Sequence, residues 1–214
     1  ELIVRDLGMK EGSKSLGTPG SKMEGKEAME SLICDKDLTG KDATMYRSIA
    51  ARAIFLAQDR TDIQFSVKEL ARFMSKPTEM DWKKLKRVGR YLMDKGRVVA
   101  KLHYQEGNKA IKVWTDTDFA GCLRTRKSTN GGVIMLGNQC IKSWSTTQAI
   151  IALSSGEAEF YGIVKGASIG LGLRSIYKDL GIEVDISMYT DSSAAKGIAF
   201  RKGLGKVRHL EVNQ

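Results

Sequence analysis

The stretch VWTDTDFAGC, Val113–Cys122, decides the fold and raises the question of function. It has the pattern of a short strand that ends with two aspartates, Asp116 and Asp118, one residue apart. Both can be solvated turn residues, or one of them can belong to a metal site. The difference matters because a strand-terminal carboxylate lies at an edge of a sheet, where other groups can join it. Two further stretches bear on the choice.

The first of these, LSSGEAEFYG at 153–162, predicts the start of a helix. Ser154 is a suitable N-cap, and it places Glu157 at the third helical position, where an acidic side chain can complete a capping box. Glu157 therefore has a sufficient structural role. Glu159, two residues further along, has no such role.

Glu159 shares a predicted helix face with Gly162, Gly166 and Gly170. These glycines form a ridge of small residues that lets a helix lie close to a sheet, although each internal glycine costs the helix roughly 1 kcal/mol. Glu159 is therefore predicted to face inward, near the start of the helix. A carboxylate in that place is costly unless it is paired or bound to a cation.

The second stretch, SMYTDSSAAKG at 187–197, places Asp191 at the end of a strand. An aspartate before a helix is also an ordinary N-cap, so a structural role is open to it. Alternatively, Asp116, Glu159 and Asp191 can converge at one edge of a sheet. Three carboxylates without a nearby histidine or cysteine suit hard cations, Mg²⁺ above all and Mn²⁺ as a second candidate. Spacing alone leaves both readings open.

From about residue 109 the predicted order of elements is three strands, a helix, a strand and a helix. The strands are AIKVWTD, GGVIMLGN, CIKSWSTT and VDISMYT, and the long helix covers about 155–180. The second and third strands are predicted to form a hairpin that turns near Gly137 and Asn138. This order favours an α/β fold in which helices pack on a mixed sheet.

The upstream part of the chain is predicted to be mainly helical. Residues 1–44 are rich in Gly, Ser and Lys and are predicted to be irregular. One helix is expected over 46–57, and another at about 79–94, where Thr78 and Asp81 can form a capping box. Between them, one helix face is formed by Ile63, Val67, Leu70 and Met74.

The chain is strongly basic, with a formal net charge of +10. Such a balance favours a polyanionic partner, most often nucleic acid. The predicted helix at 79–94 has an apolar stripe of Leu85, Val88 and Leu92, and its other faces are rich in cations. The predicted phosphate contacts are Lys83, Lys86, Arg87 and Arg90 on this helix, and Arg126 and Lys127 in a connection between strands. A solvated helix face and a solvated turn are the alternatives.

Three motif blocks, WTDTDFAGCLRTRKSTNGG, KSWSTTQAIIALSSGEAEFYG and YTDSSAAKGIA, closely resemble the ribonuclease H domain of copia-type LTR retrotransposon polyproteins. The block from Tyr46 to Leu92 resembles the segment that these polyproteins carry between reverse transcriptase and ribonuclease H. The resemblance implies three regions. They are a tail of the reverse transcriptase region or linker at 1–44, a helical connection segment at 45–108, and a ribonuclease H-like domain, incomplete at its C-terminus, at 109–214.

The resemblance also implies a ribonuclease H-like fold and cleavage of the RNA strand of RNA–DNA hybrids with two Mg²⁺ ions. Carried over by motif, Asp116, Glu159 and Asp191 match the family's metal ligands. Asp118 matches a position common in the copia branch but not in ribonucleases H generally, and either a turn role or a place beside the metal ligands is expected for it. The family's fourth carboxylate is expected beyond Gln214.

The implied partners are an RNA–DNA hybrid and the reverse transcriptase region of the same polyprotein, in an intracellular setting, either a cytoplasmic particle or the nucleus. No membrane partner is expected, since no apolar run approaches 18 residues. The competing hypothesis is a catalytically inactive remnant that acts as a nucleic-acid-binding or structural module.

Overall fold

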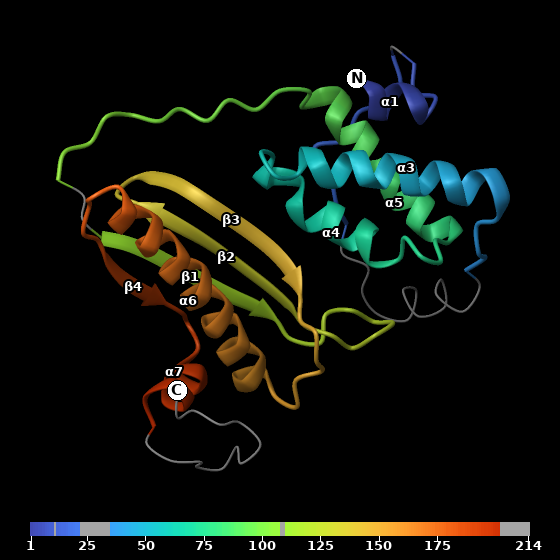
Figure 1. Ribbon diagram of the computed structural model, residues 1–214. Helices are drawn as coiled ribbons and strands as arrows, with labels where there is room; N and C mark the ends of the chain where they lie inside the picture. The colour runs from blue at the N-terminus through green and yellow to red at the C-terminus, as the bar shows by residue number, and fades with distance from the viewer. Residues whose placement is uncertain (11, 22–34, 108–109, 202–214) are drawn as a thin grey trace. The chain divides into compact units, whose positions relative to one another are not determined.

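The computed structural model describes residues 1–10, 12–21, 35–107 and 110–201 (Figure 1). The chain forms two compact units, Glu1–Ala100 and Lys101–Gln214, which we call unit 1 and unit 2. Each unit has its own hydrophobic core. None of the helices in the described ranges is both long and apolar enough to cross a membrane.

Unit 2 is built on a mixed sheet of four strands in the order β3-β2-β1-β4. Strand β1 (Ala110–Asp118) pairs antiparallel with β2 (Thr129–Leu136) and parallel with β4 (Asp185–Tyr189). Strand β3 (Gln139–Thr147) completes the predicted hairpin with β2. The hairpin turns at Gly137, whose φ of +59° favours glycine.

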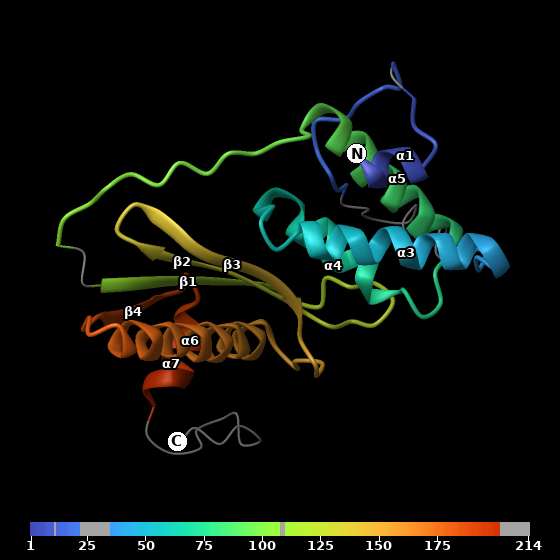
Figure 2. The same cartoon turned by 45° about the horizontal axis from the view of Figure 1, so that its top comes forward.

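Helix α6 (Ser155–Asp179) runs along one face of this sheet, as Figures 1 and 2 show. The predicted glycine ridge faces the sheet and is buried. A Cβ added to each ridge glycine would meet a side chain of β1, at 2.6 Å from Thr117 Oγ1 for Gly162, 2.5 Å from Thr115 Cγ2 for Gly166 and 3.2 Å from Val113 Cγ2 for Gly170. The close approach of helix and sheet is therefore confirmed, and it depends on the absence of side chains at these positions.

Strand β1 alternates between buried and exposed residues along its whole length. Ile111 and Val113 lie in the core of unit 2 together with Ile134 and Trp144. On the opposite face, the rings of Trp114 and Tyr189 stack with their centroids 4.2 Å apart. The last helix, α7 (Ser193–Phe200), packs against α6. The order predicted from residue 109 onwards is thus confirmed, and the fold of unit 2 is ribonuclease H-like.

Unit 1 is helical. Its longer helices are α3 (Gly40–Leu56), α4 (Gln64–Arg72) and α5 (Glu79–Asp94), and α4 follows a 3₁₀ turn at Thr61–Ile63. The predicted capping box of α5 is present, because Thr78 Oγ1 accepts from the Asp81 amide and the Asp81 carboxylate accepts from the Thr78 amide. The apolar stripe of α5 is buried in a core to which Tyr46, Ile49, Val67 and Leu70 also belong.

The prediction that residues 1–44 are irregular is wrong at both ends of that range. A short helix, α1 (Leu2–Asp6), begins the chain, and α3 starts six residues before the predicted helix at 46. Tertiary burial explains both, because Ile3 and Leu7 enter the core of unit 1 and Ala43 is 4% exposed. Local composition carries no sign of such contacts.

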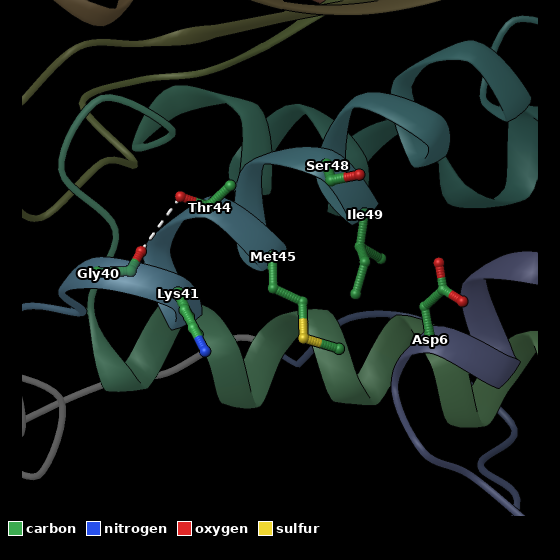
Figure 3. Close-up of a pocket in the computed structure, with 7 residues that line it drawn as sticks. All are labelled: Asp6, Gly40, Lys41, Thr44, Met45, Ser48 and Ile49. Atoms are coloured by element: carbon green, nitrogen blue, oxygen red, sulfur yellow. Dashed lines mark hydrogen bonds between the residues drawn. The ribbon is translucent and has the colours of Figure 1, made fainter.

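Unit 1 also contains an open, mainly apolar hollow of about 740 Å³ beside α3. It is lined by Asp6, Gly40, Lys41, Thr44, Met45, Ser48 and Ile49 (Figure 3). Asp6 is already paired with Arg5 and Arg52, and Thr44 Oγ1 donates to the Gly40 carbonyl. The lining therefore offers no cluster of free polar groups that would mark a binding site.

Candidate metal centre

Three carboxylates meet at the end of β1. One oxygen from each of Asp116, Glu159 and Asp191 lies within 4.8 Å of the others. The parallel pairing of β1 and β4 explains why the two aspartates are close. Trp114 pairs with Tyr189, and Asp116 comes two residues after Trp114 just as Asp191 comes two residues after Tyr189. Glu159 comes from the first turns of α6. The structure thus brings together the three residues that the sequence singled out.

Glu159 is the buried member of the cluster, at 6% exposure, whereas Asp116 and Asp191 are exposed. The Thr117 amide donates to both Asp116 Oδ1, at 2.9 Å, and Glu159 Oε1, at 3.2 Å. Glu159 Oε2 is buried and accepts no hydrogen bond. Burial, together with the negative charge of Asp116 and Asp191, raises the pKa of Glu159 to about 6.

Asp191 does not cap the helix that follows it. The N-cap of α7 is Ser192, whose hydroxyl accepts from the Ala195 amide at 3.1 Å. The structural role that the sequence left open for Asp191 is therefore filled by its neighbour. Its exposed carboxylate lies beside the other two without a capping duty.

Glu157 and Asp118 have structural roles, as expected. Ser154 caps α6 by accepting from the Glu157 amide, but the Glu157 carboxylate accepts from the Leu153 amide rather than from that of Ser154, and it also accepts from the Tyr161 hydroxyl. The Asp118 carboxylate lies against Gly121, in the turn after β1, and is outside the three-carboxylate cluster. The capping box predicted here is thus modified, and Asp118 is the last residue of β1, with its carboxylate directed at the turn that follows.

Sequence reasoning missed a buried amide that supports the cluster. Gln148, 5% exposed, donates through Nε2 to Asn130 Oδ1 at 2.6 Å and to the Ala158 carbonyl at 2.8 Å. It therefore joins β2 to the turn of α6 that carries Glu159. A single glutamine between a strand and a helix cap belongs to no periodic pattern, so no local signal predicts its role.

The donor set fits a hard divalent cation. Carboxylate oxygens are the ligands that Mg²⁺ and Mn²⁺ prefer. Three like charges this close repel one another, and one buried oxygen, Glu159 Oε2, lacks the hydrogen-bond donor that a buried acceptor normally has. A cation among the three carboxylates would remove both costs.

The basic residues predicted to contact phosphate fall into two groups. Arg126 and Lys127 lie in the connection after β1, at the same end of the sheet as Asp116. Lys83, Lys86 and Arg90 are exposed on α5, in unit 1. Arg87 is half-buried instead, and its Nη2 donates to Thr18 Oγ1.

We predict that Glu159→Gln raises the free energy of unfolding by about 1–2 kcal/mol at pH 7.5 in EDTA. The folded-state pKa lies above the ordinary value of 4.5, so wild-type stability is fully present below pH 4.5 and falls as pH rises through 6. The gain should therefore vanish below pH 4.5. Urea unfolding at both pH values measures it, and added Mg²⁺ should stabilise the wild type more than the variant.

Glu157→Gln is the matched control for that measurement. Glu157 is also buried and lies on the same turn, but its oxygens accept hydrogen bonds from Leu153 and Tyr161. This variant should gain no stability at pH 7.5. Equal stability of Glu159→Gln and wild type at pH 7.5 would show that Glu159 is not destabilised by its surroundings.

A four-stranded mixed sheet covered by α6, with a carboxylate cluster at the end of β1, is the arrangement of a ribonuclease H-like fold. Comparison with known sequences identifies its relatives. The chain is 33% identical over 144 residues to the retrovirus-related Pol polyprotein from transposon RE2 of Arabidopsis thaliana. This match covers 67% of the chain and 10% of the relative. It is 26% identical over 218 residues to that from transposon TNT 1-94 of Nicotiana tabacum, covering 99% of this chain and 16% of the relative.

A third relative is an uncharacterized mitochondrial protein of Arabidopsis thaliana, AtMg00810, which is 35% identical over 59% of this chain and 52% of its own length. No family model and no solved structure matches the chain. The homologues of the chain are thus retrovirus-related Pol polyproteins from transposons, in agreement with its resemblance to copia-type polyproteins. The chain spans about a tenth of the length of the first of these polyproteins.

Proposed function

We propose that the chain is a ribonuclease H domain that hydrolyses the RNA strand of RNA–DNA hybrids. The observation that carries the proposal is the convergence of three carboxylate oxygens within 4.8 Å, one of them from a buried glutamate with a free oxygen. The similarity to transposon Pol polyproteins supports it, because such elements copy RNA into DNA and pass through a hybrid. The reverse transcriptase region of the same polyprotein is the proposed partner.

In the proposed mechanism, Asp116, Glu159 and Asp191 hold divalent cations, Mg²⁺ or Mn²⁺. When bound, the cations supply water activation and charge stabilisation at the scissile phosphate. The chain's own residues prepare the site. The Thr117 amide holds Asp116 and Glu159 in register, Gln148 fixes the turn that carries Glu159, and Ser192 leaves Asp191 free of the helix cap.

The protonation of Glu159 sets the pH range of this mechanism. With a pKa near 6, Glu159 is mostly ionised at pH 7.5, and bound cations would ionise it further. Below pH 6 a proton competes with the cation for the same carboxylate. Activity is therefore expected to fall on the acid side of neutrality.

The substrate would be held through its backbone. Arg126 and Lys127 at the end of the sheet can contact phosphates close to the carboxylates, and recognition of hybrid geometry and 2′-hydroxyls requires little sequence preference. The exposed cations of α5, in unit 1, are a separate set of candidate phosphate contacts.

The decisive experiment is cleavage of an end-labelled RNA–DNA hybrid by the purified chain in Mg²⁺, with EDTA and a DNA–DNA duplex of the same sequence as controls. Cleavage of the RNA strand alone, dependent on the cation, supports the proposal. If the chain binds the hybrid but does not cleave it, the assay is repeated on a chain extended past Gln214 to include the expected fourth carboxylate. No cleavage by either chain favours the non-catalytic binding module.

The role of α5 has its own test. Replacing Lys83 and Arg90 with glutamine should reduce the slope of log K against log salt for hybrid binding by about 2, since each lost phosphate contact removes about 0.9. The charge-matched control is Lys41→Gln with Lys76→Gln, because Lys41 lies on α3 and Lys76 is paired with Asp37 at 2.9 Å. Equal slopes for the two double variants, measured by fluorescence anisotropy, would exclude phosphate contacts from α5.

A further inference from the structure

A side-chain hydrogen bond joins the residues around Thr18 to α5. Arg87 Nη2 donates to Thr18 Oγ1 at 2.8 Å, across 69 residues of sequence. Thr18 is exposed and is followed directly by Pro19. The hydroxyl is thus accessible from solvent and lies within hydrogen-bond distance of a guanidinium group.

The guanidinium of Arg87 is only partly used by this contact. Its Nε is buried and has no hydrogen-bond acceptor. Nε and Nη2 form one edge of the planar guanidinium group, and the two N–H groups on that edge are spaced to meet two oxygens of a carboxylate or phosphate at once. A hydroxyl oxygen can satisfy only one of them. The unused Nε is therefore the donor that a larger, anionic group in place of the hydroxyl would engage.

The electrostatic surroundings favour such an anion. Lys83, Lys84, Lys86 and Arg90 lie within about one turn of Arg87 on α5. The nearest acid on the N-terminal side of the helix, Asp81, is held by the Thr78 cap and by Lys84. A dianion at Thr18 would thus meet several positive charges and little opposing negative charge.

We propose that Thr18 is a phosphorylation site and that its phosphate docks on the Nε–Nη2 edge of Arg87. Proline-directed protein kinases act on a threonine that precedes proline, which is the context of Thr18. In the reaction, a bond forms between Thr18 Oγ1 and the γ-phosphorus of ATP, and the bond from that phosphorus to the β–γ bridging oxygen breaks. ADP leaves, and the hydroxyl proton passes to a carboxylate of the kinase.

The modification would change both the charge and the attachment of this segment. A phosphate adds about −1.5 to −2 charges at neutral pH, and it replaces one hydrogen bond to a neutral hydroxyl with a pair of hydrogen bonds between two opposite charges. The segment that carries Thr18 would then be fastened to α5, and the positive potential of that helix would fall. The inference does not depend on the proposed ribonuclease activity, because its readout is the stability of unit 1.

The test uses the full chain with phosphothreonine incorporated at position 18, compared with the unmodified chain by thermal unfolding. The midpoint of unit 1 is followed through Trp82, whose ring packs against the core of that unit. Phosphorylation should raise the midpoint by about 4 °C or more. The increase should be lost in Arg87→Lys, which keeps the charge but removes the two-donor edge, and retained in Arg90→Lys, an exposed cation on the same helix.

Each midpoint change is measured against the unphosphorylated form of the same variant, so a loss of basal stability does not obscure it. An unchanged or lower midpoint on phosphorylation of the wild type, or an equal increase in Arg87→Lys, would overturn the docking of the phosphate. A separate incubation of the unmodified chain with a proline-directed kinase and ATP should place phosphate on Thr18, detected by peptide mass spectrometry. Absence of phosphate there would overturn the modification site.

Discussion

Asp116→Asn should lower the rate of RNA-strand cleavage by about a thousandfold, which corresponds to about 4 kcal/mol of transition-state stabilisation. The substitution keeps the shape of the side chain and the hydrogen bond from the Thr117 amide, but it removes one negative charge from the three-carboxylate cluster. The remaining charges would hold divalent cations more weakly and in a different place. The measurement is the single-turnover rate on a labelled hybrid at saturating Mg²⁺.

The chain offers a close control in Asp118→Asn. Asp118 is an exposed residue of the same strand, and its replacement makes the same change in net charge. Its carboxylate lies against Gly121 in the turn, away from the cluster. Cleavage by this variant should stay within a few-fold of the wild type. A large loss in Asp118→Asn together with a small one in Asp116→Asn would reverse the assignment of the ligand.

Gly166→Ala should lower the free energy of unfolding by about 1–3 kcal/mol, the usual cost of overpacking a well-filled core. Its new methyl group would lie 2.5 Å from Thr115 Cγ2 and 3.1 Å from both Met188 Cε and Val113 Cγ1. Relief would require α6 to move away from the sheet, and Glu159 would move with it. Urea unfolding measures the loss, and reduced cleavage is expected to accompany it.

Gly172→Ala on the same helix should change the free energy of unfolding in the opposite direction. A Cβ at Gly172 meets nothing within 4 Å, so alanine there should raise the free energy of unfolding by up to about 1 kcal/mol through helix propensity. Comparison of Gly166→Ala with Gly172→Ala separates the effect of helix propensity from the effect of packing against the sheet. Two substitutions that both stabilise the chain would show that α6 can leave the sheet without cost.

Much of unit 2 could be predicted because its residues obey short-range rules. The alternation along β1 predicts which face of the sheet is buried. The four-residue spacing of Gly162, Gly166 and Gly170 predicts which face of α6 can approach it, so the contact between the two faces follows. The inward position of Glu159 follows from the same spacing. These periodic patterns predict the packing of α6 on the sheet and one of the candidate metal ligands, Glu159.

The remaining features depend on partners that are distant in sequence. Whether Asp191 or Ser192 caps α7 is a choice between two good caps one residue apart, and local preference cannot make it. The sequence predicts a phosphate contact at Arg87, yet its partner in the structure is Thr18, 69 residues away. Gln148 can join β2 to α6 only because the fold brings Asn130 Oδ1 and the Ala158 carbonyl within hydrogen-bond distance of its Nε2.

The amide of Thr117 aligns two members of the site without using its side chain. The hydrogen bonds to Asp116 and Glu159 come from the main chain, so every residue except proline supplies the same donor at position 117, provided that its side chain fits the buried space beside Gly162. Substitutions at position 117 that fit this space therefore keep the two carboxylates aligned, whereas loss of Asp116, Glu159 or Asp191 removes a member of the cluster itself. If the proposed cleavage depends on this cluster, copies of the sequence that lack one of the three acids would be inactive, and sequencing related copies at these positions would identify them.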